Sequence, residues 1–146
     1  MQIQKGCTLL NPEDKNFNVI ANQVQSINLS YFQQLEAGDM LFIDSSHVSK
    51  TGSDLNFVLF DILPVLKSDV LIHFHDIFYP FEYPEEWVYE GRSWNEIYLI
   101  KAFLMCNSEF EILFFSHYLH IHLPGSFESM PLCYHNPGGN LWIQKK

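Results

Sequence analysis

Four residues in two short stretches have side chains suited to acid–base or metal chemistry. Asp44 and His47 stand three positions apart after one apolar run, and His75 and Asp76 directly end another. An imidazole can accept a proton near neutral pH. Carboxylate oxygens and imidazole nitrogens also bind divalent cations such as Mg²⁺, Mn²⁺ or Fe²⁺. The residue types therefore indicate a proton-transfer site or a metal site, provided that the fold brings them together.

The elements that would position these residues alternate between strand and helix. Continuous apolar runs predict strands buried on both faces, and apolar residues at helical spacing predict amphipathic helices. This alternation is typical of an α/β sheet with crossover helices. We expect strands at residues 7–12, 17–27, 40–44, 70–74, 110–115 and 140–145, and helices at residues 29–38, 53–67 and 93–107.

Two of the predicted helices carry clear local signals. In the helix at 53–67 one apolar stripe is expected to face the sheet, and in the helix at 93–107 Ser93 and Glu96 have the spacing of a capping box. The stripe consists of Leu55, Val58, Leu59, Ile62 and Leu66.

The strand ends are the expected place of a binding site. Ligands of such sheets bind beyond the carboxyl ends of the parallel strands. Asp44 and the pair His75 and Asp76 should therefore meet at one edge of the sheet.

A structural role for the two aspartates competes with a functional one. Asp at a strand end often caps the next turn, and Ser45 and Ser46 favour a turn as well. For Asp44 or Asp76 alone, capping is the better interpretation. Their joint occurrence on adjacent strand ends favours a site.

Two further groups of residues allow a functional interpretation. The aromatic loop from 77 to 87 either forms a lid over an acceptor molecule or packs on the sheet. His120 and His122 would face one way on a strand, as zinc ligands can. However, no third candidate ligand stands at a sequence spacing that would support a zinc site. We interpret both histidines as ordinary sheet or loop residues.

Composition limits the class of protein. Eight Lys and Arg against 17 Asp and Glu give a formal charge of −9, which argues against nucleic-acid binding. Three cysteines without CxxC spacing fit a reducing compartment. No signal peptide and no membrane-spanning run of about 20 apolar residues is seen. We therefore expect a cytoplasmic protein without a membrane or nucleic-acid partner.

Three segments carry a resemblance to a known family. "GDMLFIDSSHVSKTGSD", "ILPVLKSDVLIHFHDIFYPFEYPEEW" and "SWNEIYLIKAFL" resemble class I S-adenosylmethionine-dependent methyltransferases. The resemblance is to the small-molecule branch whose fourth strand ends in Asp-x-x-His and whose fifth ends in His-Asp. It runs from about Cys7 onward. It implies one domain over residues 1–146 with a Rossmann-like sheet, mostly parallel with an antiparallel C-terminal strand, and helices on both faces.

The same resemblance implies roles for individual residues. His47 would be the base, and Asp76 would act with it in catalysis. Related metal-assisted enzymes hold Mg²⁺ at the ends of these two strands. The implied metal ligands are Asp44, His75 and Asp76, and the implied S-adenosylmethionine-binding residues are Asn11, Glu13, Asp44 and Ser45.

The N-terminal part departs from the family pattern. A first strand and a glycine-rich cofactor loop should precede Cys7, and none of the seven glycines supplies that loop. We therefore expect a methyltransferase domain that is incomplete at its N-terminus and weakened in cofactor binding. Methyl transfer to a small-molecule hydroxyl with metal assistance is the leading function. A non-catalytic truncated domain that self-associates, or a metal-dependent hydrolase, are the alternatives; a homo-oligomer is expected.

Overall fold

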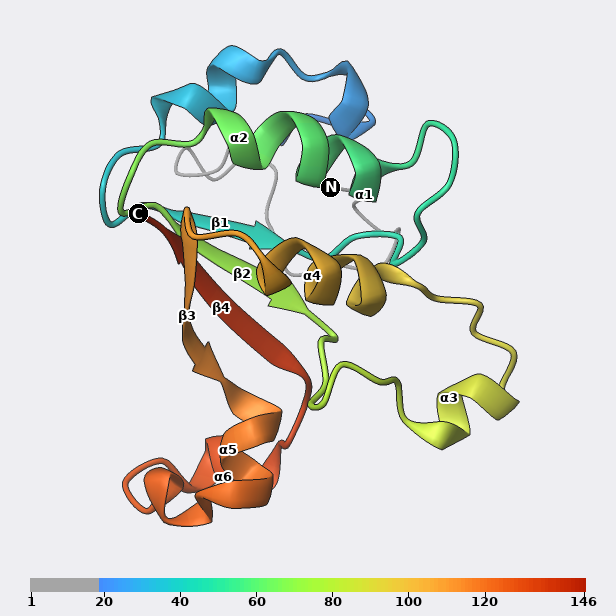
Figure 1. The fold of residues 1–146 in the computed structure, drawn as a ribbon, viewed down its shortest axis with the longest axis vertical. Coiled ribbons are helices and arrows are strands. Elements are labelled where there is room, and N and C mark those ends of the chain that lie inside the picture. Colours follow the sequence, from blue (N-terminus) through green and yellow to red (C-terminus); the bar gives the residue numbers. More distant parts are fainter. Residues whose placement is uncertain (1–18) are drawn as a thin grey trace.

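The computed structural model describes residues 19–146 and shows a small α/β domain built on a mixed four-stranded sheet (Figure 1). The strand order is β1-β2-β4-β3, in which β1 and β2 are parallel and β4 runs antiparallel to both of its neighbours. The strands are β1 (Met40–Ile43), β2 (Leu71–His75), β3 (Phe110–Phe115) and β4 (Asn140–Lys145). These four predicted strands and the antiparallel orientation of β4 are confirmed. The strand predicted at 7–12 lies outside the described residues.

Helical segments connect the strands. The predicted helix at 53–67 is a continuous segment whose central turn is π-helical, because Pro64 has no N–H for the carbonyl group four residues earlier and its ring crowds that group. All five residues of its predicted stripe are buried. The segments are η1 (Val24–Ser26), η2 (Leu29–Gln34), α1 (Asp54–Phe57), η3 (Val58–Ile62), α2 (Leu63–Val65), α3 (Glu85–Tyr89), α4 (Glu96–Met105), α5 (Ser116–His122), η4 (Pro124–Phe127) and α6 (Pro131–His135).

The two crossover connections lie on the same face of the sheet (Figure 1). Lys145 of β4 points toward this face and donates to the carbonyl oxygen of Pro64 in α2, at 2.7 Å. Phe110, the strand partner of Lys145, packs on Phe103 of α4 with ring centroids 5.0 Å apart. Both crossover connections therefore cover one face of the sheet, whereas the helical segment η4 contacts the other face. Both connections step the same way across the sheet, and right-handed crossovers then share a face.

This arrangement makes the two faces of β1 unequal. Ile43 is buried against the helices, whereas Met40 and Phe42 on the opposite face are each 52% exposed. The prediction that this run is buried on both faces is wrong. Within residues 19–146, β1 has a strand partner on one side only and no helix over its outer face. The opposite face of the sheet is contacted by Phe127 of η4, which lies beside Phe114 of β3.

Three other segments differ from expectation. From residue 19 onward the strand predicted at 17–27 is irregular chain with one short 3-10 helix, because polar side chains interrupt its apolar positions. The helix predicted at 29–38 is the 3-10 helix η2, and Gly38 beyond it has a φ of +86°. Residues 116–122, expected as strand or loop, form α5.

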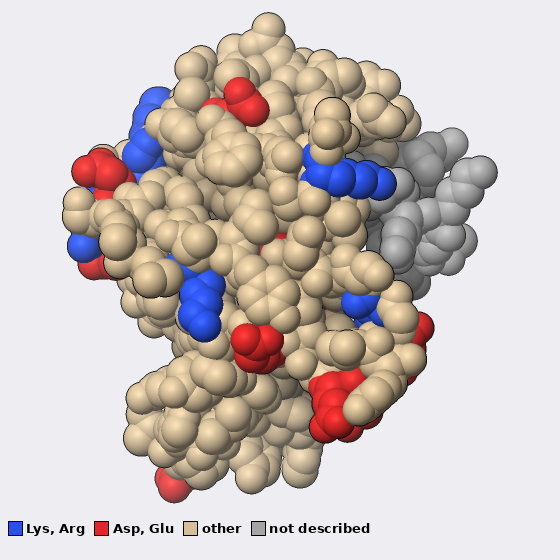
Figure 2. All heavy atoms as spheres, turned by 45° about the vertical axis from the view of Figure 1, so that its right-hand side comes forward, with Lys and Arg blue, Asp and Glu red and all other residues tan. Residues whose placement is uncertain are grey.

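The surface shows no concentration of basic groups on the face seen in Figure 2. There the Lys and Arg side chains are spread out, some of them beside carboxylates at the left, and the largest group of carboxylates lies at the lower right. In the part of the chain that the structure describes, no helix has the length and apolar character needed to cross a membrane.

Candidate functional site

The carboxyl ends of β1 and β2 bring three of the predicted residues together. The parallel register pairs the last residue of β1, Ile43, with Phe74, so that Asp44 and Asp76 follow neighbouring strand ends. His47 lies between them: its Nε2 atom is 3.5 Å from Oδ1 of Asp44 and 3.8 Å from Oδ2 of Asp76. The expected meeting of Asp44 and Asp76 at one edge of the sheet is confirmed.

The turn after β1 is built by local hydrogen bonds. Ser45 Oγ accepts from the His47 backbone N–H at 2.8 Å. Ser46 donates from both its backbone N–H and its hydroxyl to Asp54, which ties the turn to the start of α1. His47 and Asp76 adopt φ angles of 57° and 59°. Such left-handed conformations are uncommon outside glycine, and they concentrate at functional sites.

Glu96 completes the site from the opposite side. It is the first residue of α4, is 1% exposed, and its Oε2 atom lies 2.6 Å from Nδ1 of His47. The predicted capping box is wrong, because Asn95 is the N-cap residue and the Glu96 carboxylate reaches His47 instead. We call Asp44, His47, Asp76 and Glu96 the rim cluster.

The rim cluster shifts the protonation equilibria of its members. Burial lowers the pKa of His47, but the hydrogen bond and charge of Glu96 and the charges of Asp76 and Asp44 outweigh it, so the pKa lies above the ordinary 6.5. Burial raises the pKa of Glu96, and the hydrogen bond with His47 offsets only part of this effect. The cluster can therefore take up a proton at the imidazole and stabilise it there.

His75 touches the rim cluster only at its edge. The side chain is 41% exposed, and its Nε2 atom lies 3.5 Å from Oδ1 of Asp76. Across residues 19–146, no group of three or more His, Cys, Asp or Glu side chains has an arrangement that could hold a metal ion. The predicted ligand set of Asp44, His75 and Asp76 is thus unsupported, since both carboxylates are directed at His47.

Aromatic rings lie on one side of the imidazole. Trp94 packs on the His47 ring with centroids 4.1 Å apart. Trp87 and Tyr83 pack in turn on Trp94, at 5.3 and 5.8 Å. The aromatic loop at 77–87 is therefore divided: the part with Tyr83 and Trp87 lies beside the rim cluster. Its other part, Tyr79 and Phe81, packs on Phe115 of β3.

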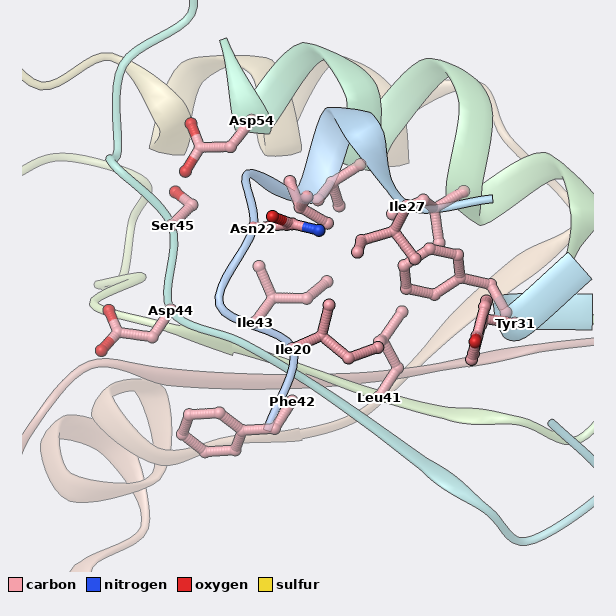
Figure 3. A pocket seen from close by; sticks show the side chains of 14 residues that line it. Ile20, Asn22, Ile27, Tyr31, Leu41, Phe42, Ile43, Asp44, Ser45 and Asp54 are labelled. Carbon is pink, nitrogen blue, oxygen red and sulfur yellow. The ribbon is translucent and has the colours of Figure 1, made fainter. Parts of the chain in front are cut away.

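A cavity of about 210 Å³ opens beside Asp44 (Figure 3). Asp44, Ser45 and Asp54 stand at one end, and Ile27 and Tyr31 stand at the other. An apolar pocket with a few polar groups suits the ring and hydroxyl groups of a nucleoside. The residues present thus fit part of an S-adenosylmethionine molecule. Two predicted cofactor residues, Asn11 and Glu13, lie outside the described residues.

The two distal histidines do not form a zinc site. On helix α5, side chains two positions apart point away from one another, in contrast to a strand. His120 contacts the carbonyl oxygens of Ser116 and Cys133, and the His122 ring packs on Tyr79. Both are packing residues, as expected, although on a helix.

Comparison with known proteins links the β1–β2 half of the domain to one family model. Residues 10–77, just under half of the chain, match a model described as a methyltransferase domain. The matched segment contains β1, β2 and the helical segment between them, and with them Asp44, His47 and Asp76. Searches among curated proteins and among solved structures found no match. Glu96 lies beyond the matched segment.

Proposed function

We propose that this protein is an S-adenosylmethionine-dependent methyltransferase that acts on a hydroxyl group of a small molecule. The observation that carries the proposal is the position of His47. Its side chain lies among those of Asp44, Asp76 and Glu96, beside the ends of β1 and β2. Both strands belong to the segment that matches a methyltransferase domain. An imidazole held in this way can accept the proton of a hydroxyl group.

Each member of the rim cluster has a separate task in this proposal. The Nε2 atom of His47 accepts the proton, and the negative charge of Glu96 stabilises the imidazolium that results. Asp76, whose side chain is 20% exposed, can accept a hydrogen bond from the acceptor molecule and orient it. When bound, the cofactor supplies an electrophilic methyl group. The protein contributes chiefly by holding the reacting groups in place.

Cofactor contacts follow from the cavity beside Asp44. We expect Asp44 and Ser45 to bind the ribose hydroxyls, while the contacts of Asn11 and Glu13 remain predictions. Metal assistance has no support from the arrangement of the described residues, and no step requires it. Self-association also remains a prediction.

The raised pKa of His47 gives the reaction an expected pH dependence. The neutral imidazole is the base, and its fraction grows as the pH rises through a pKa above 6.5. The rate of methyl transfer should therefore increase across this interval and then level off.

Calorimetric titration with S-adenosylhomocysteine, with and without Mg²⁺, tests the proposal. We expect binding in the micromolar range that does not require Mg²⁺, and about tenfold weaker binding in Asp44→Asn. Asp61→Asn is a matched control, because Asp61 is an exposed carboxylate on η3.

Three outcomes would contradict the proposal. A folded protein that takes up Mg²⁺ but not S-adenosylhomocysteine would favour a metal-dependent hydrolase. A folded protein that binds neither would favour a non-catalytic domain, and its self-association would then be measured by sedimentation. Equal binding by Asp44→Asn and the unaltered protein would remove Asp44 from the cofactor site.

A further inference from the structure

Glu96 occupies an unusual place for a carboxylate. As the first residue of a helix it would ordinarily face solvent, yet it is 1% exposed. A buried carboxylate is unfavourable unless it is paired and hydrogen-bonded. Its Oε2 atom lies 2.6 Å from Nδ1 of His47. This is slightly shorter than the ~2.7–2.9 Å of a charge-assisted N–H···O hydrogen bond.

The hydrogen bond of Glu96 is not a helix cap. The N-cap residue of α4, Asn95, uses its own side chain elsewhere: its Oδ1 atom accepts from the Ser49 N–H at 2.6 Å. Within the described residues the second oxygen of Glu96 has no hydrogen-bond partner. A residue needed only for packing and one hydrogen bond could be a neutral amide. The carboxylate therefore points to a role for its charge.

The backbone holds the start of α4 against the turn after β1. The His47 carbonyl oxygen accepts from the N–H groups of Asn95 and Glu96, at 2.9 and 3.1 Å. Trp94 covers one side of the imidazole, with ring planes 30° apart. The imidazole is thus held by its backbone, by one ring face and by one nitrogen, which leaves Nε2 as the atom directed at Asp44 and Asp76.

From this geometry we infer that Glu96 is a positioning residue, which keeps the proton of the neutral His47 ring on Nδ1 and leaves Nε2 free to act. An ionised carboxylate only accepts hydrogen bonds, so Nδ1 must be the donor. With Nδ1 occupied, an incoming proton can be taken up only at Nε2. The consequence for methyl transfer rests on the proposed function; the orientation of the ring does not.

Nuclear magnetic resonance of the ¹⁵N-histidine-labelled full chain tests this inference without any substrate. We expect the neutral His47 ring to carry its proton on Nδ1, with that proton resonating far downfield because its hydrogen bond is short and charged. In Glu96→Gln the resonance should move upfield or vanish, and in Glu96→Asp it should be partly restored. Glu82→Gln is the matched control, because it removes an exposed carboxylate that binds Tyr98 of the same helix.

Two results would overturn the inference. One is a neutral His47 ring with its proton on Nε2 in the unaltered protein, a measurement that needs no variant. The other is a Glu96→Gln protein, folded by its far-ultraviolet circular dichroism, whose His47 resonances are unchanged. Failure of the proposed function is a separate observation, because it would appear as absent S-adenosylhomocysteine binding while the downfield resonance persists.

Discussion

The rim cluster and the α5–η4–α6 segment both hold a histidine against aromatic rings, but they surround its nitrogens differently. The His47 nitrogens face carboxylates of Glu96, Asp44 and Asp76. The two ring nitrogens of His120 face backbone carbonyl oxygens, at 2.8 and 3.2 Å, while its ring stacks on Phe127. The comparison teaches that the charge of the partners, and not the number of histidines, distinguishes a candidate proton-transfer site from a packed helix.

Removal of the buried carboxylate should have the largest effect. Glu96→Ala leaves the His47 imidazole without its closest partner and opens a space in the core, so we expect the free energy of unfolding to fall by about 3 kcal/mol. Urea denaturation measures this loss. A fall below about 1 kcal/mol would show that the buried pair matters no more than a surface ion pair.

A change that touches none of the four side chains should also disturb the rim cluster. A Cβ atom at Gly139 would lie 2.7 Å from the carbonyl oxygen of Ile77, the residue directly after Asp76. Gly139→Ala should therefore reduce stability by about 2 kcal/mol, the range of an overpacked core. Gly125→Ala is the control, because its Cβ would meet its nearest atom at 3.6 Å. Equal denaturation midpoints for the two variants would contradict this prediction.

Replacement of His120 should reduce stability by less, and its effect should stay within the α5–η4–α6 segment. His120→Phe keeps the stacking on Phe127 but loses the bonds to Ser116 and Cys133, so we expect a loss of about 1 kcal/mol. The binding of S-adenosylhomocysteine and the resonances of His47 should not change. If either changes, the two regions are coupled and the contrast between them is wrong.

The smallest effect on stability is expected from replacement of His117, and this effect depends on pH. Burial lowers the pKa of His117, and the charge of His120 adds to this, although the Tyr79 carbonyl acts in the opposite direction. The folded pKa lies below the unfolded 6.5, so stability present above 6.5 is lost as the pH falls toward the folded value. His117→Gln should reduce the decline in urea midpoint between about pH 7.5 and about pH 5.5. His135→Gln, at an exposed position, should leave that decline unchanged.

Much of the fold could be predicted because its strands and main helices have strong apolar patterns. Residues 17–27 show the limit: their β-branched residues suggested a strand, but from residue 19 onward the chain pairs with no strand and only Val24 enters the core. The shared face of the two crossovers could not be predicted without the strand order, in which β4 enters between β2 and β3.

The site could be predicted in part for a similar reason. Asp44, His47 and Asp76 stand at strand ends, and strand ends are readable from the sequence. Glu96 comes from a helix 49 positions after His47, and its spacing to Ser93 suggested a cap. Its burial depends on how α4 packs in the folded protein. The only hint in the sequence is that Glu96 is the first residue of a helix rich in apolar residues. The resemblance implied His75 as a metal ligand, but its half-exposed side chain touches the cluster only through Asp76.

The place of β4 has a consequence for the order in which the protein assembles during synthesis. β3 pairs only with β4 in the described sheet, although β4 follows it in the sequence by 25 residues or more. Until residues 140–145 have left the ribosome, at about 5–20 residues per second, β3 has no strand to join and α4 has no anchored strand after it. We expect Glu96 to dock on His47 only then, so the nascent chain passes through a stage in which β1 and β2 have formed but the imidazole still lacks its partner.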